Sequence, residues 1–227
     1  MQGPLEVEKK YRVTNTDTIK TFLQNLPFEK EKRVVDHYFD TKDGLFYQHG
    51  IFIRVRNDLS LDIKFNPEHL KEDASNTRGD HVVCHEYNIP LPFSTVSEQT
   101  FEAINKAFAG HIFLTKPNPF TFEAFLEENN LSTLVLLDKK RTTYRTDTLE
   151  IALDEFKDFG TFIEFESKQT HTTMDAFYHD VSLLTEDLNI EPFDSGYVEL
   201  ALLQTNEALY KTGKYLIHKT SDHAKAA

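Results

Sequence analysis

The chain has 227 residues, of which 39% are hydrophobic and 27% charged, with a formal net charge of −12 and one cysteine. This composition is typical of a globular protein of one large domain, and the lone Cys84 excludes an intramolecular disulfide and a thiolate metal cluster. The negative charge argues against nucleic acid as the main partner, because phosphate-backbone binding needs a broad basic surface. No apolar stretch approaches the length that spans a bilayer, and the first residues lack the features of a secretory signal, so we expect a cytoplasmic protein without a membrane partner.

Eight segments are rich in Val, Ile, Phe, Tyr and Thr, and turn residues separate many of them, which predicts strands. They are residues 4–13, 34–39, 50–57, 60–66, 81–89, 133–147, 149–155 and 160–168. Asn57-Asp58 lies between the third and fourth segments and predicts a hairpin. Asp158-Phe159-Gly160 predicts another turn before the last strand.

Five segments favour helices. Residues 16–26, 172–188 and 197–211 have helical character, and the first two carry their apolar residues on one stripe. Ser97 is expected to cap a helix that runs to Phe108, and Pro119 is expected at the first position of a helix that runs to about Glu128.

Together these elements predict an α+β protein built on a closed eight-stranded antiparallel β-barrel with helices covering the outside. We expect one domain over residues 1–219, with a polar loop at residues 67–80 and a disordered tail at residues 220–227. Asp40 is expected to lie in a turn, and Tyr38 and Phe39 in the core. Nothing in the sequence indicates an oligomeric state.

Glu6, Glu8 and Lys10 lie two residues apart near the N-terminus. In a strand this spacing places the three side chains on one face. Two carboxylates there are suitable oxygen ligands for Mg²⁺ or Mn²⁺, and the lysine can reach a phosphate shared with the metal. The alternative interpretation is an ordinary solvated face of an edge strand.

Charges of opposite sign segregate into different strands. Carboxylate pairs lie in the first and last strands, as Glu6/Glu8 and Glu164/Glu166, and cation pairs lie between them, as Arg54/Arg56 and Lys139/Arg141, with Lys64 as a single cation. If the sheet closes with these faces inward, the enclosed charges would be costly unless ligands neutralise them. A divalent metal with a polyphosphate would do this, because carboxylates hold the metal and cations hold the phosphate oxygens.

The motifs also match a known family in order. Glu6-Val7-Glu8-Lys9-Lys10 resembles the N-terminal signature of the CYTH superfamily, the triphosphate tunnel metalloenzymes. Further matching features follow over residues 5–204: Tyr38-Phe39-Asp40-Thr41, Arg54-Val55-Arg56, Lys64, Glu86-Tyr87, Lys139-Lys140-Arg141, Asp154 and the run from Gly160 to Glu166. The resemblance implies a barrel that forms a tunnel, with a triphosphate inside and one or two Mg²⁺ or Mn²⁺ ions.

On this basis we expect metal-dependent hydrolysis of a small-molecule triphosphate, either inorganic tripolyphosphate or a small organic one such as thiamine triphosphate. The expected metal ligands are Glu6, Glu8, Asp154, Glu164 and Glu166. The expected triphosphate-binding residues are Lys10, Arg54, Arg56, Lys64, Lys139 and Arg141. Lys10 and Glu86 are the expected catalytic residues. The alternatives are a class IV adenylyl cyclase that converts ATP to cyclic AMP, and a non-catalytic polyphosphate or nucleotide binder.

One position departs from the family pattern. Many members begin their last helix with Lys-Ser-Tyr, whereas this chain has Ser195-Gly196-Tyr197, so that Ser195 replaces the lysine. Lys214 and Lys219 are candidates to compensate for the missing phosphate contact.

Overall fold

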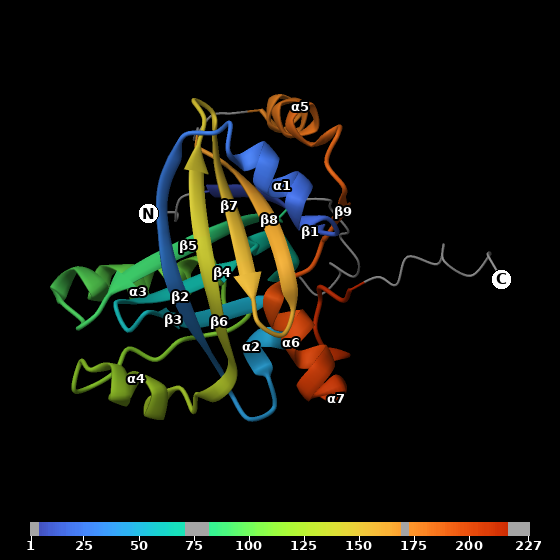
Figure 1. Cartoon of the computed structure of the whole chain (residues 1–227). Helices are drawn as coiled ribbons and strands as arrows, with labels where there is room; N and C mark the ends of the chain where they lie inside the picture. The colour runs from blue at the N-terminus through green and yellow to red at the C-terminus, as the bar shows by residue number, and fades with distance from the viewer. Residues whose placement is uncertain (1–4, 71–81, 169–172, 218–227) are drawn as a thin grey trace.

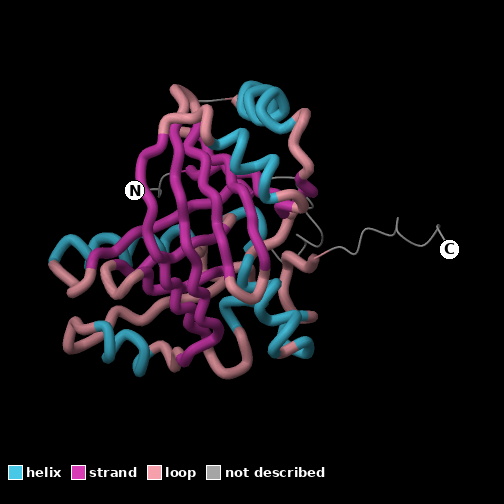
Figure 2. Tube along the Cα trace, in the orientation of Figure 1, coloured by secondary structure: helices cyan, strands magenta, loops and turns pink. Residues whose placement is uncertain are grey.

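The computed structural model describes residues 5–70, 82–168 and 173–217, and these form one large, strongly curved antiparallel sheet with helices packed around it (Figures 1 and 2). The described strands follow the order β5-β4-β3-β2-β6-β7-β8-β1-β9. They are β1 (Leu5–Val13), β2 (Phe28–Asp40), β3 (Ile51–Arg56), β4 (Ser60–Phe65), β5 (Val82–Pro90), β6 (Ser132–Arg145), β7 (Leu149–Phe156), β8 (Gly160–Ser167) and β9 (Ile190–Pro192). The helices are α1 (Thr16–Leu23), α2 (Leu45–Gln48), α3 (Thr95–Ala107), α4 (Phe122–Glu128), α5 (Met174–Thr185), α6 (Tyr197–Thr205) and α7 (Glu207–Tyr210), with a 3-10 helix η1 (Pro67–Leu70).

Strand β1 pairs with three strands and brings the β5 end of the sheet next to the β8 end. It pairs with β8 along residues 8–12 and with β9 along residues 11–13. Its first four residues also pair with β5, from Leu5 opposite His85 to Glu8 opposite Val82. The expected eight-stranded closed barrel is therefore corrected. The described sheet has nine strands, and it is not a barrel closed along its length, because β5 meets β1 over only four residue pairs before β9 takes over that edge.

Helices cover the apolar outer faces of the strands, as expected (Figure 1). Alternate residues of β3, β4 and β5 pack against α3 and α4 in a core that contains Ile53 and Phe101. Alternate residues of β1, β7 and β8 pack against α1 and α5 in a second core that contains Phe165 and Phe177. These two cores fix which face of each strand points outward, and so which face carries the polar residues.

The predicted turns are confirmed. Asn57 and Asp58 have φ values of 51° and 57°, and the Leu59 N–H donates to the Arg56 carbonyl at 3.0 Å. Two consecutive left-handed residues are the conformation of a type I′ hairpin turn, which asparagine and aspartate tolerate. Gly160, after the second predicted turn, has a φ of 93°.

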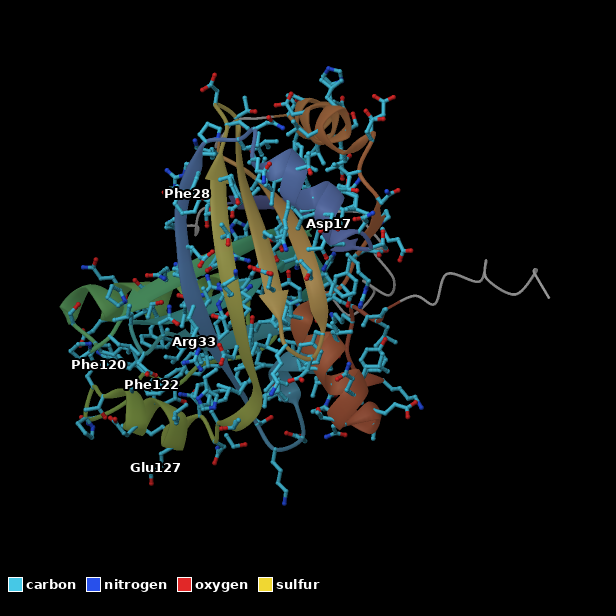
Figure 3. The ribbon with its side chains drawn as sticks, in the orientation of Figure 1. Asp17, Phe28, Arg33, Phe120, Phe122 and Glu127 are labelled. Atoms are coloured by element: carbon cyan, nitrogen blue, oxygen red, sulfur yellow. The ribbon has the colours of Figure 1, made fainter. Side chains whose placement is uncertain are left out.

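Several element boundaries differ from the predicted ones. Strand β2 begins at Phe28 instead of residue 34, because its exposed, charged first half is held by pairing with β6 and carries no apolar alternation; Figure 3 labels Phe28 and Arg33 on this strand. Helix α4 begins at Phe122 instead of at Pro119, since the Thr121 side chain accepts a hydrogen bond from the Ala124 N–H at 3.2 Å.

The C-terminal helix expected over residues 197–211 is two helices. They meet at Asn206, whose side chain accepts from the Leu209 N–H at 3.1 Å and so begins α7. Helix α3 starts at Thr95, so Ser97 lies inside it and is not its cap. The short elements α2, η1 and β9 were not predicted.

Asp40 does more than occupy a turn. It is buried at the end of β2, and its carboxylate accepts from the N–H groups of Thr41, Phe46 and Tyr47 at 2.7, 3.0 and 2.7 Å. It therefore holds the start of α2, which follows Gly44. Residues 71–80 of the predicted loop and the predicted tail lie outside the described residues. No helix of the described part combines the length and the apolar character needed to cross a membrane.

Candidate functional site

The charged strand residues that the sequence assigned to the site lie on the face opposite to the helices α1, α3, α4 and α5, which we call the inner face. In β3, Ile53 and Val55 are buried in the outer core, so Arg54 and Arg56 point to the inner face. The same alternation holds in β8, where Phe165 is buried in the outer core and separates Glu164 from Glu166. Helix α6 covers one end of the inner face, where Tyr197 packs against Phe156 and Phe162. Segments distant in the sequence thus contribute charges to one face.

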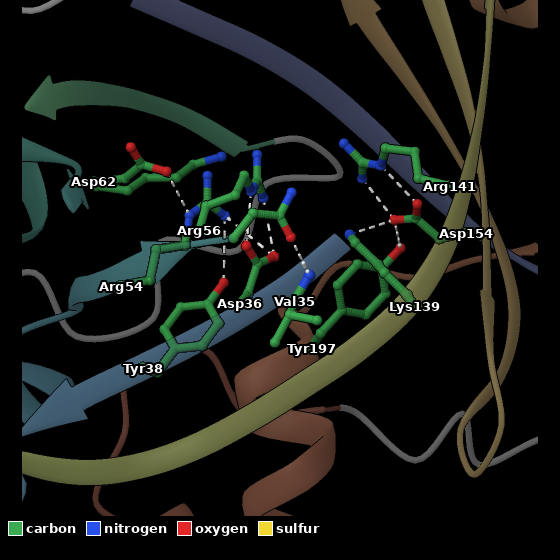
Figure 4. A network of polar contacts seen from close by, with 12 residues as sticks. Val35, Asp36, Tyr38, Arg54, Arg56, Asp62, Lys139, Arg141, Asp154 and Tyr197 are labelled. Atoms are coloured by element: carbon green, nitrogen blue, oxygen red, sulfur yellow. Dashed lines mark hydrogen bonds and ion pairs between the residues drawn. The ribbon is translucent and has the colours of Figure 1, made fainter. Parts of the chain in front are cut away.

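A first group of contacts is centred on Asp154, which is fully buried. Its Oδ1 accepts from Arg141 Nε at 2.6 Å, and its Oδ2 accepts from Arg141 Nη2 and Lys139 Nζ, both at 2.6 Å. The Tyr197 hydroxyl donates to the same Oδ2 at 3.1 Å. Arg141 lies directly opposite Asp154 across β6 and β7, and it also contacts Glu164. Figure 4 shows the group on the right of the view.

A second group is centred on Arg54, on the other side of the inner face in Figure 4. Arg54 Nε donates to Asp62 at 3.1 Å, Nη1 to the Tyr38 hydroxyl at 3.3 Å, and Nη2 to Glu86 at 3.0 Å. Asp36 binds the neighbouring Arg56 through two hydrogen bonds, from Nε at 2.7 Å and from Nη2 at 3.0 Å. The expected core position of Tyr38 is confirmed, and its hydroxyl also joins this polar group.

Glu8 lies between the first group and Lys64, which is directly opposite Glu86 of the second group across β4 and β5. The Glu8 carboxylate lies 3.4 Å from Lys64 Nζ, on β4, and 3.9 Å from Lys10 Nζ, on its own strand. Lys10 in turn lies 3.3 Å from Glu164 and 4.4 Å from the centre of the Tyr197 ring. The structure therefore brings together the described side chains that the sequence selected on β1, β4, β6, β7 and β8, and places Arg54, Arg56 and Glu86 next to them.

The protonation states follow from burial and from the neighbouring charges. Burial would raise the pKa of Glu164, but the charges of Arg141 and Lys10 hold it well below its usual range. Burial alone would lower the pKa of Lys10, but Glu164 and Glu8 outweigh it and raise that pKa. Burial, together with the charge of Arg141, lowers the pKa of Lys139 to about 8. The inner face is thus a set of compensated charges at neutral pH.

Of the five carboxylates expected to bind a divalent metal, four are suitable ligands and one is not. Glu8 and Glu166 are direct cross-strand partners on the inner face, and like charges in that position destabilise a sheet unless a cation lies between them. Glu164 follows on the same face, and Glu6 precedes Glu8 on β1; the Glu6 side chain lies outside the described residues. These carboxylates fit Mg²⁺ or Mn²⁺ chemically. Asp154 does not fit, because its oxygens already accept four hydrogen bonds in a fully buried position.

Within the described residues, no three histidine, cysteine, aspartate or glutamate side chains already stand in an arrangement that could hold a metal ion. Glu8 and Glu164 instead contact the cations Lys10, Lys64 and Arg141. A metal at these carboxylates would therefore require those ion pairs to loosen.

Sequence reasoning missed several residues of this site. Asp36 and Asp62 are both buried and bind the arginines, and Asn88 donates to Asp62 at 2.6 Å. Asp62 and Asn88 alternate with apolar residues in β4 and β5, as the predicted residues do, and this was the available signal; Asp36 lies between Val35 and His37 and gives no such signal. Tyr197 was noticed only as part of a departing motif.

No described lysine of the C-terminal segment takes the place of the lysine that the family pattern has before Tyr197. Ser195 is buried, and its hydroxyl donates to the Tyr215 carbonyl at 2.6 Å. Lys214 contacts the His69 carbonyl, so its described contact is to the backbone rather than to the inner face. Lys219 lies outside the described residues.

Glu199, in the first turn of α6, is a further buried carboxylate. It is fully buried, and neither carboxylate oxygen has a hydrogen-bond partner among the described residues. Its Oε2 would lie 2.2 Å from a Cβ placed on Gly196, so that only glycine fits at the start of this helix without a shift. Burial raises the pKa of Glu199 to about 7.

Comparisons with known proteins agree with this architecture. A family model described as CYTH domain matches residues 4–191, which is most of the chain. No curated protein matches the chain. The solved structure of the PH1819 protein from Pyrococcus horikoshii OT3 is 18% identical with a TM-score of 0.52, over 88% of this chain and 98% of that one. The PH1012 protein of the same organism is 17% identical with a TM-score of 0.50, over 86% and 98% of the two chains.

A third solved structure, HpAC1, is similar to the same extent. HpAC1 from Hippeastrum is described as a candidate adenylyl cyclase in which a triphosphatase activity dominates. It is 16% identical with a TM-score of 0.52, over 88% of this chain and 95% of that one. At these identities the likeness concerns the fold alone.

Proposed function

The chain belongs to the CYTH family, whose members include triphosphatases and class IV adenylyl cyclases, and we propose that it hydrolyses a small-molecule triphosphate with the help of a divalent metal. The substrate that we favour is inorganic tripolyphosphate or a small organic triphosphate. HpAC1, which shares this fold, has a dominant triphosphatase activity, and by analogy with it we take the hydrolase as the first hypothesis and the cyclase as the second.

One observation carries the proposal: cations and carboxylates from separate strands share one face at contact distance. Lys10, Lys64 and Arg141 come from β1, β4 and β6, and each lies within 4 Å of Glu8 or Glu164. A solvated surface would not need to bury such charges, because burial of ions is costly unless they are paired. A linear triphosphate presents several anionic oxygens in a row, and these cations offer several donors in one place.

The residues have separate tasks in the proposed reaction. Lysine and arginine side chains of the inner face would hold the phosphate chain, so that its terminal phosphorus faces an attacking water. Glu6, Glu8, Glu164 and Glu166 would hold the metal, which would be Mg²⁺ or Mn²⁺. When bound, the metal would neutralise charge that develops on the phosphate oxygens.

The proposed chemistry is a simple hydrolysis. The water oxygen forms a bond to the terminal phosphorus, the bridging P–O bond breaks, and the proton of the water leaves with the products, which are orthophosphate and a diphosphate. Lys10 lies 3.3 Å from Glu164, so it would contact both the phosphate chain and a carboxylate of the metal set. Glu86 would orient a cation, since it accepts from Arg54 at 3.0 Å.

The test is a substrate panel. Tripolyphosphate, thiamine triphosphate and ATP are each incubated with the protein and Mg²⁺ or Mn²⁺, and orthophosphate and cyclic AMP are measured. We expect orthophosphate release that stops when the metal is chelated. Cyclic AMP as the main product from ATP would identify a cyclase, and triphosphate binding without any product would identify a non-catalytic binder.

A matched pair of variants connects the activity to the inner face. Glu8→Gln should abolish metal-dependent turnover. Glu98→Gln should not, because Glu98 is exposed on α3 and pairs with Lys116 far from the inner face. Wild-type activity in Glu8→Gln would contradict the metal assignment.

A further inference from the structure

Lys32 is a cation of the inner face that the sequence analysis did not select. It lies on β2 directly opposite Arg141 of β6, so the two side chains share one face of the sheet. The next residue, Arg33, points to the opposite face, where it pairs with Asp138. Lys32 is exposed, and in the part of the chain that the structure describes its ammonium group has no ion pair and no hydrogen bond. It therefore differs from the six cations assigned to triphosphate binding, because each of those contacts a carboxylate.

The surroundings of Lys32 are mainly positive. Like charges directly opposite each other destabilise a sheet, and Lys32 meets Arg141 in this way. Partial burial of the ammonium group and the charges of Lys30, Arg56 and Arg141 lower the pKa of Lys32, and the charge of Glu150 opposes them only in part. Lys32 thus adds a positive charge that no carboxylate among the described residues pairs with.

Lys32 lies toward the open end of the inner face. The last three residues of β2 are buried, whereas its first six, residues 28–33, are exposed. The cations of the inner face become more accessible in the same direction, from 3% exposed for the Lys139 side chain to 15% for Arg141 and 45% for Lys30. In Figure 1 the first half of β2 runs along β6 at the end of the sheet away from α6. A ligand bound to the enclosed cations would therefore extend outward past Lys32.

The opposite end of the inner face is occupied by the C-terminal segment. Phe52, on the inner face of β3, stacks on the Tyr215 ring with 6.0 Å between the ring centres. Tyr215 is held by two hydrogen bonds, one between its hydroxyl and His69 Nδ1 at 2.6 Å and one from the Ser195 hydroxyl to its carbonyl at 2.6 Å. A ligand too long for the enclosed cations would thus extend toward the first half of β2 rather than toward Tyr215.

We propose that Lys32 is a further phosphate-binding residue, and that the substrate is a linear inorganic polyphosphate whose chain continues past the enclosed cations to reach it. The inference rests on the proposed function and names its substrate class. The reaction is the same hydrolysis. Water forms a bond to the terminal phosphorus at the enclosed end, the bridging P–O bond breaks, and the proton of the water leaves with the products, which are orthophosphate and a chain shorter by one phosphate.

The charge of the outer part of the ligand decides between substrate classes. Each further phosphate of an inorganic chain adds negative charge, and Lys32 can bind it through a charge-assisted hydrogen bond without giving up a carboxylate. A polyanion at this position would also relieve the repulsion between Lys32 and Arg141. The thiamine part of thiamine triphosphate carries a positively charged ring, and adenosine is neutral, so neither gains from Lys32.

The experiment measures how affinity depends on chain length and on Lys32. Tripolyphosphate and tetrapolyphosphate are titrated by calorimetry, in metal-free buffer, into the wild type, Lys32→Gln, Lys32→Arg and Lys140→Gln. Lys140 is the matched control, because it is a lysine of the neighbouring strand β6 that points to the opposite face and contacts Glu31 and Glu155. We expect the ratio of the two affinities, tetrapolyphosphate over tripolyphosphate, to fall about two- to fivefold in Lys32→Gln, which is the contribution of an exposed ion pair. Lys32→Arg and Lys140→Gln should keep the wild-type ratio.

Two further measurements separate ligand binding from a structural role. The melting temperature of Lys32→Gln should equal or exceed that of the wild type, because the variant removes a cation that faces Arg141. The affinity of this variant for thiamine triphosphate should fall less than its affinity for tetrapolyphosphate, because the organic part of the ester gains nothing from Lys32.

The outcomes are distinguishable. If Lys32→Gln keeps the wild-type affinity ratio, or if Lys140→Gln lowers it as much, the role of Lys32 is wrong while the proposed function stands. A thiamine triphosphate affinity that falls as much as that for tetrapolyphosphate would overturn the role of Lys32 in the same way. If the wild-type protein binds neither polyphosphate, both proposals are overturned. Binding without release of orthophosphate in the presence of Mg²⁺ or Mn²⁺ would overturn the hydrolysis, and a lowered ratio in Lys32→Gln would still support Lys32 as a phosphate-binding residue.

Discussion

Replacing Asp154 by asparagine removes one negative charge from the centre of the first group and keeps the size of the side chain. Asp154 is fully buried and accepts four hydrogen bonds from Arg141, Lys139 and Tyr197. An asparagine offers one acceptor oxygen, and its amide group meets two cations. We expect a large loss of stability, because the substitution leaves buried cations without their counter-charge.

The size of the loss can be worked from these contacts. Removing one member of a buried ion pair costs about 3–5 kcal/mol. Arg141 keeps its contact with Glu164, so the low end of that range, about 3 kcal/mol, applies here. Asp154 also supports the protonated form of Lys139, whose pKa is already lowered to about 8, so that without it Lys139 is expected to lose its proton near neutral pH. At roughly 2–4 °C per kcal/mol for a chain of this size, the melting temperature should fall by about 6–12 °C.

The assay is urea unfolding at pH 7, with thermal unfolding as a second measurement. The control is Asp138→Asn, since Asp138 forms a two-bond ion pair with Arg33 that is largely exposed and should contribute little. A loss below about 1 kcal/mol for Asp154→Asn, or one equal to that of the control, would refute the view of Asp154 as the buried anchor of this group.

Three further predictions concern other carboxylates of the site. Burial would raise the pKa of Asp36, but hydrogen bonds from Arg56 and the charge of Arg54 lower it to about 2; its stabilisation, about 2 kcal/mol, should be present above pH 4 and lost as the pH falls from 4 to 2. Unfolding measured against pH should therefore show a flatter acid limb in Asp36→Asn, and an unchanged limb would contradict this. Burial raises the pKa of Glu199 to about 7, so its ionised form destabilises the fold as the pH rises from about 4.5 through 7, by roughly 3 kcal/mol in full. Glu199→Gln should accordingly be more stable relative to the wild type at pH 8 than at pH 5, and equal differences at both pH values would sink the idea. Finally, Glu8→Gln should weaken Mn²⁺ binding measured by electron paramagnetic resonance, with Glu98→Gln as the unaffected control, because Glu8 lies opposite Glu166 on the inner face; unchanged Mn²⁺ affinity would remove Glu8 from the metal set.

The period-two pattern carried most of what could be predicted. In β3 and β8 an apolar residue separates each pair of charges, so the sequence alone places Arg54 with Arg56, and Glu164 with Glu166, on faces opposite to the core. The β3–β4 turn was also predictable from its asparagine and aspartate, because few residues adopt a positive φ at both central positions of such a turn. These signals are local, and each depends on a few adjacent residues.

Cross-strand partners could not be predicted, because they depend on register between distant segments. Asp36 faces Arg56 only because β2 pairs with β3 in one particular register, and no local signal in the sequence sets that register. The same holds for Asp154, which the family pattern assigned to the metal and the structure places against Arg141. The first half of β2 was not predicted for another reason. Its residues are exposed and charged, and they form a strand only because they pair with β6.

The pairing of charges on the inner face bears on how a ligand would enter it. The cations of this face that the sequence assigned to triphosphate binding are Lys10, Arg54, Arg56, Lys64, Lys139 and Arg141, and each contacts at least one of the carboxylates Glu8, Asp36, Asp62, Glu86, Asp154 and Glu164. Without a ligand these six cations are therefore paired within the protein, and a triphosphate that arrived alone would bring its negative charge next to those carboxylates.

A divalent metal would change this balance, because with Glu8 and its neighbours as ligands it would free Lys10 and Lys64 for phosphate oxygens. Metal and triphosphate should then bind cooperatively, each raising the affinity of the other by the same factor. Calorimetric titration of tripolyphosphate with and without Mn²⁺, and of Mn²⁺ with and without tripolyphosphate, would measure both factors. Affinities that do not depend on the second ligand, after correction for the metal–triphosphate complex in solution, would mean that the carboxylates keep their lysine partners and that the metal binds elsewhere.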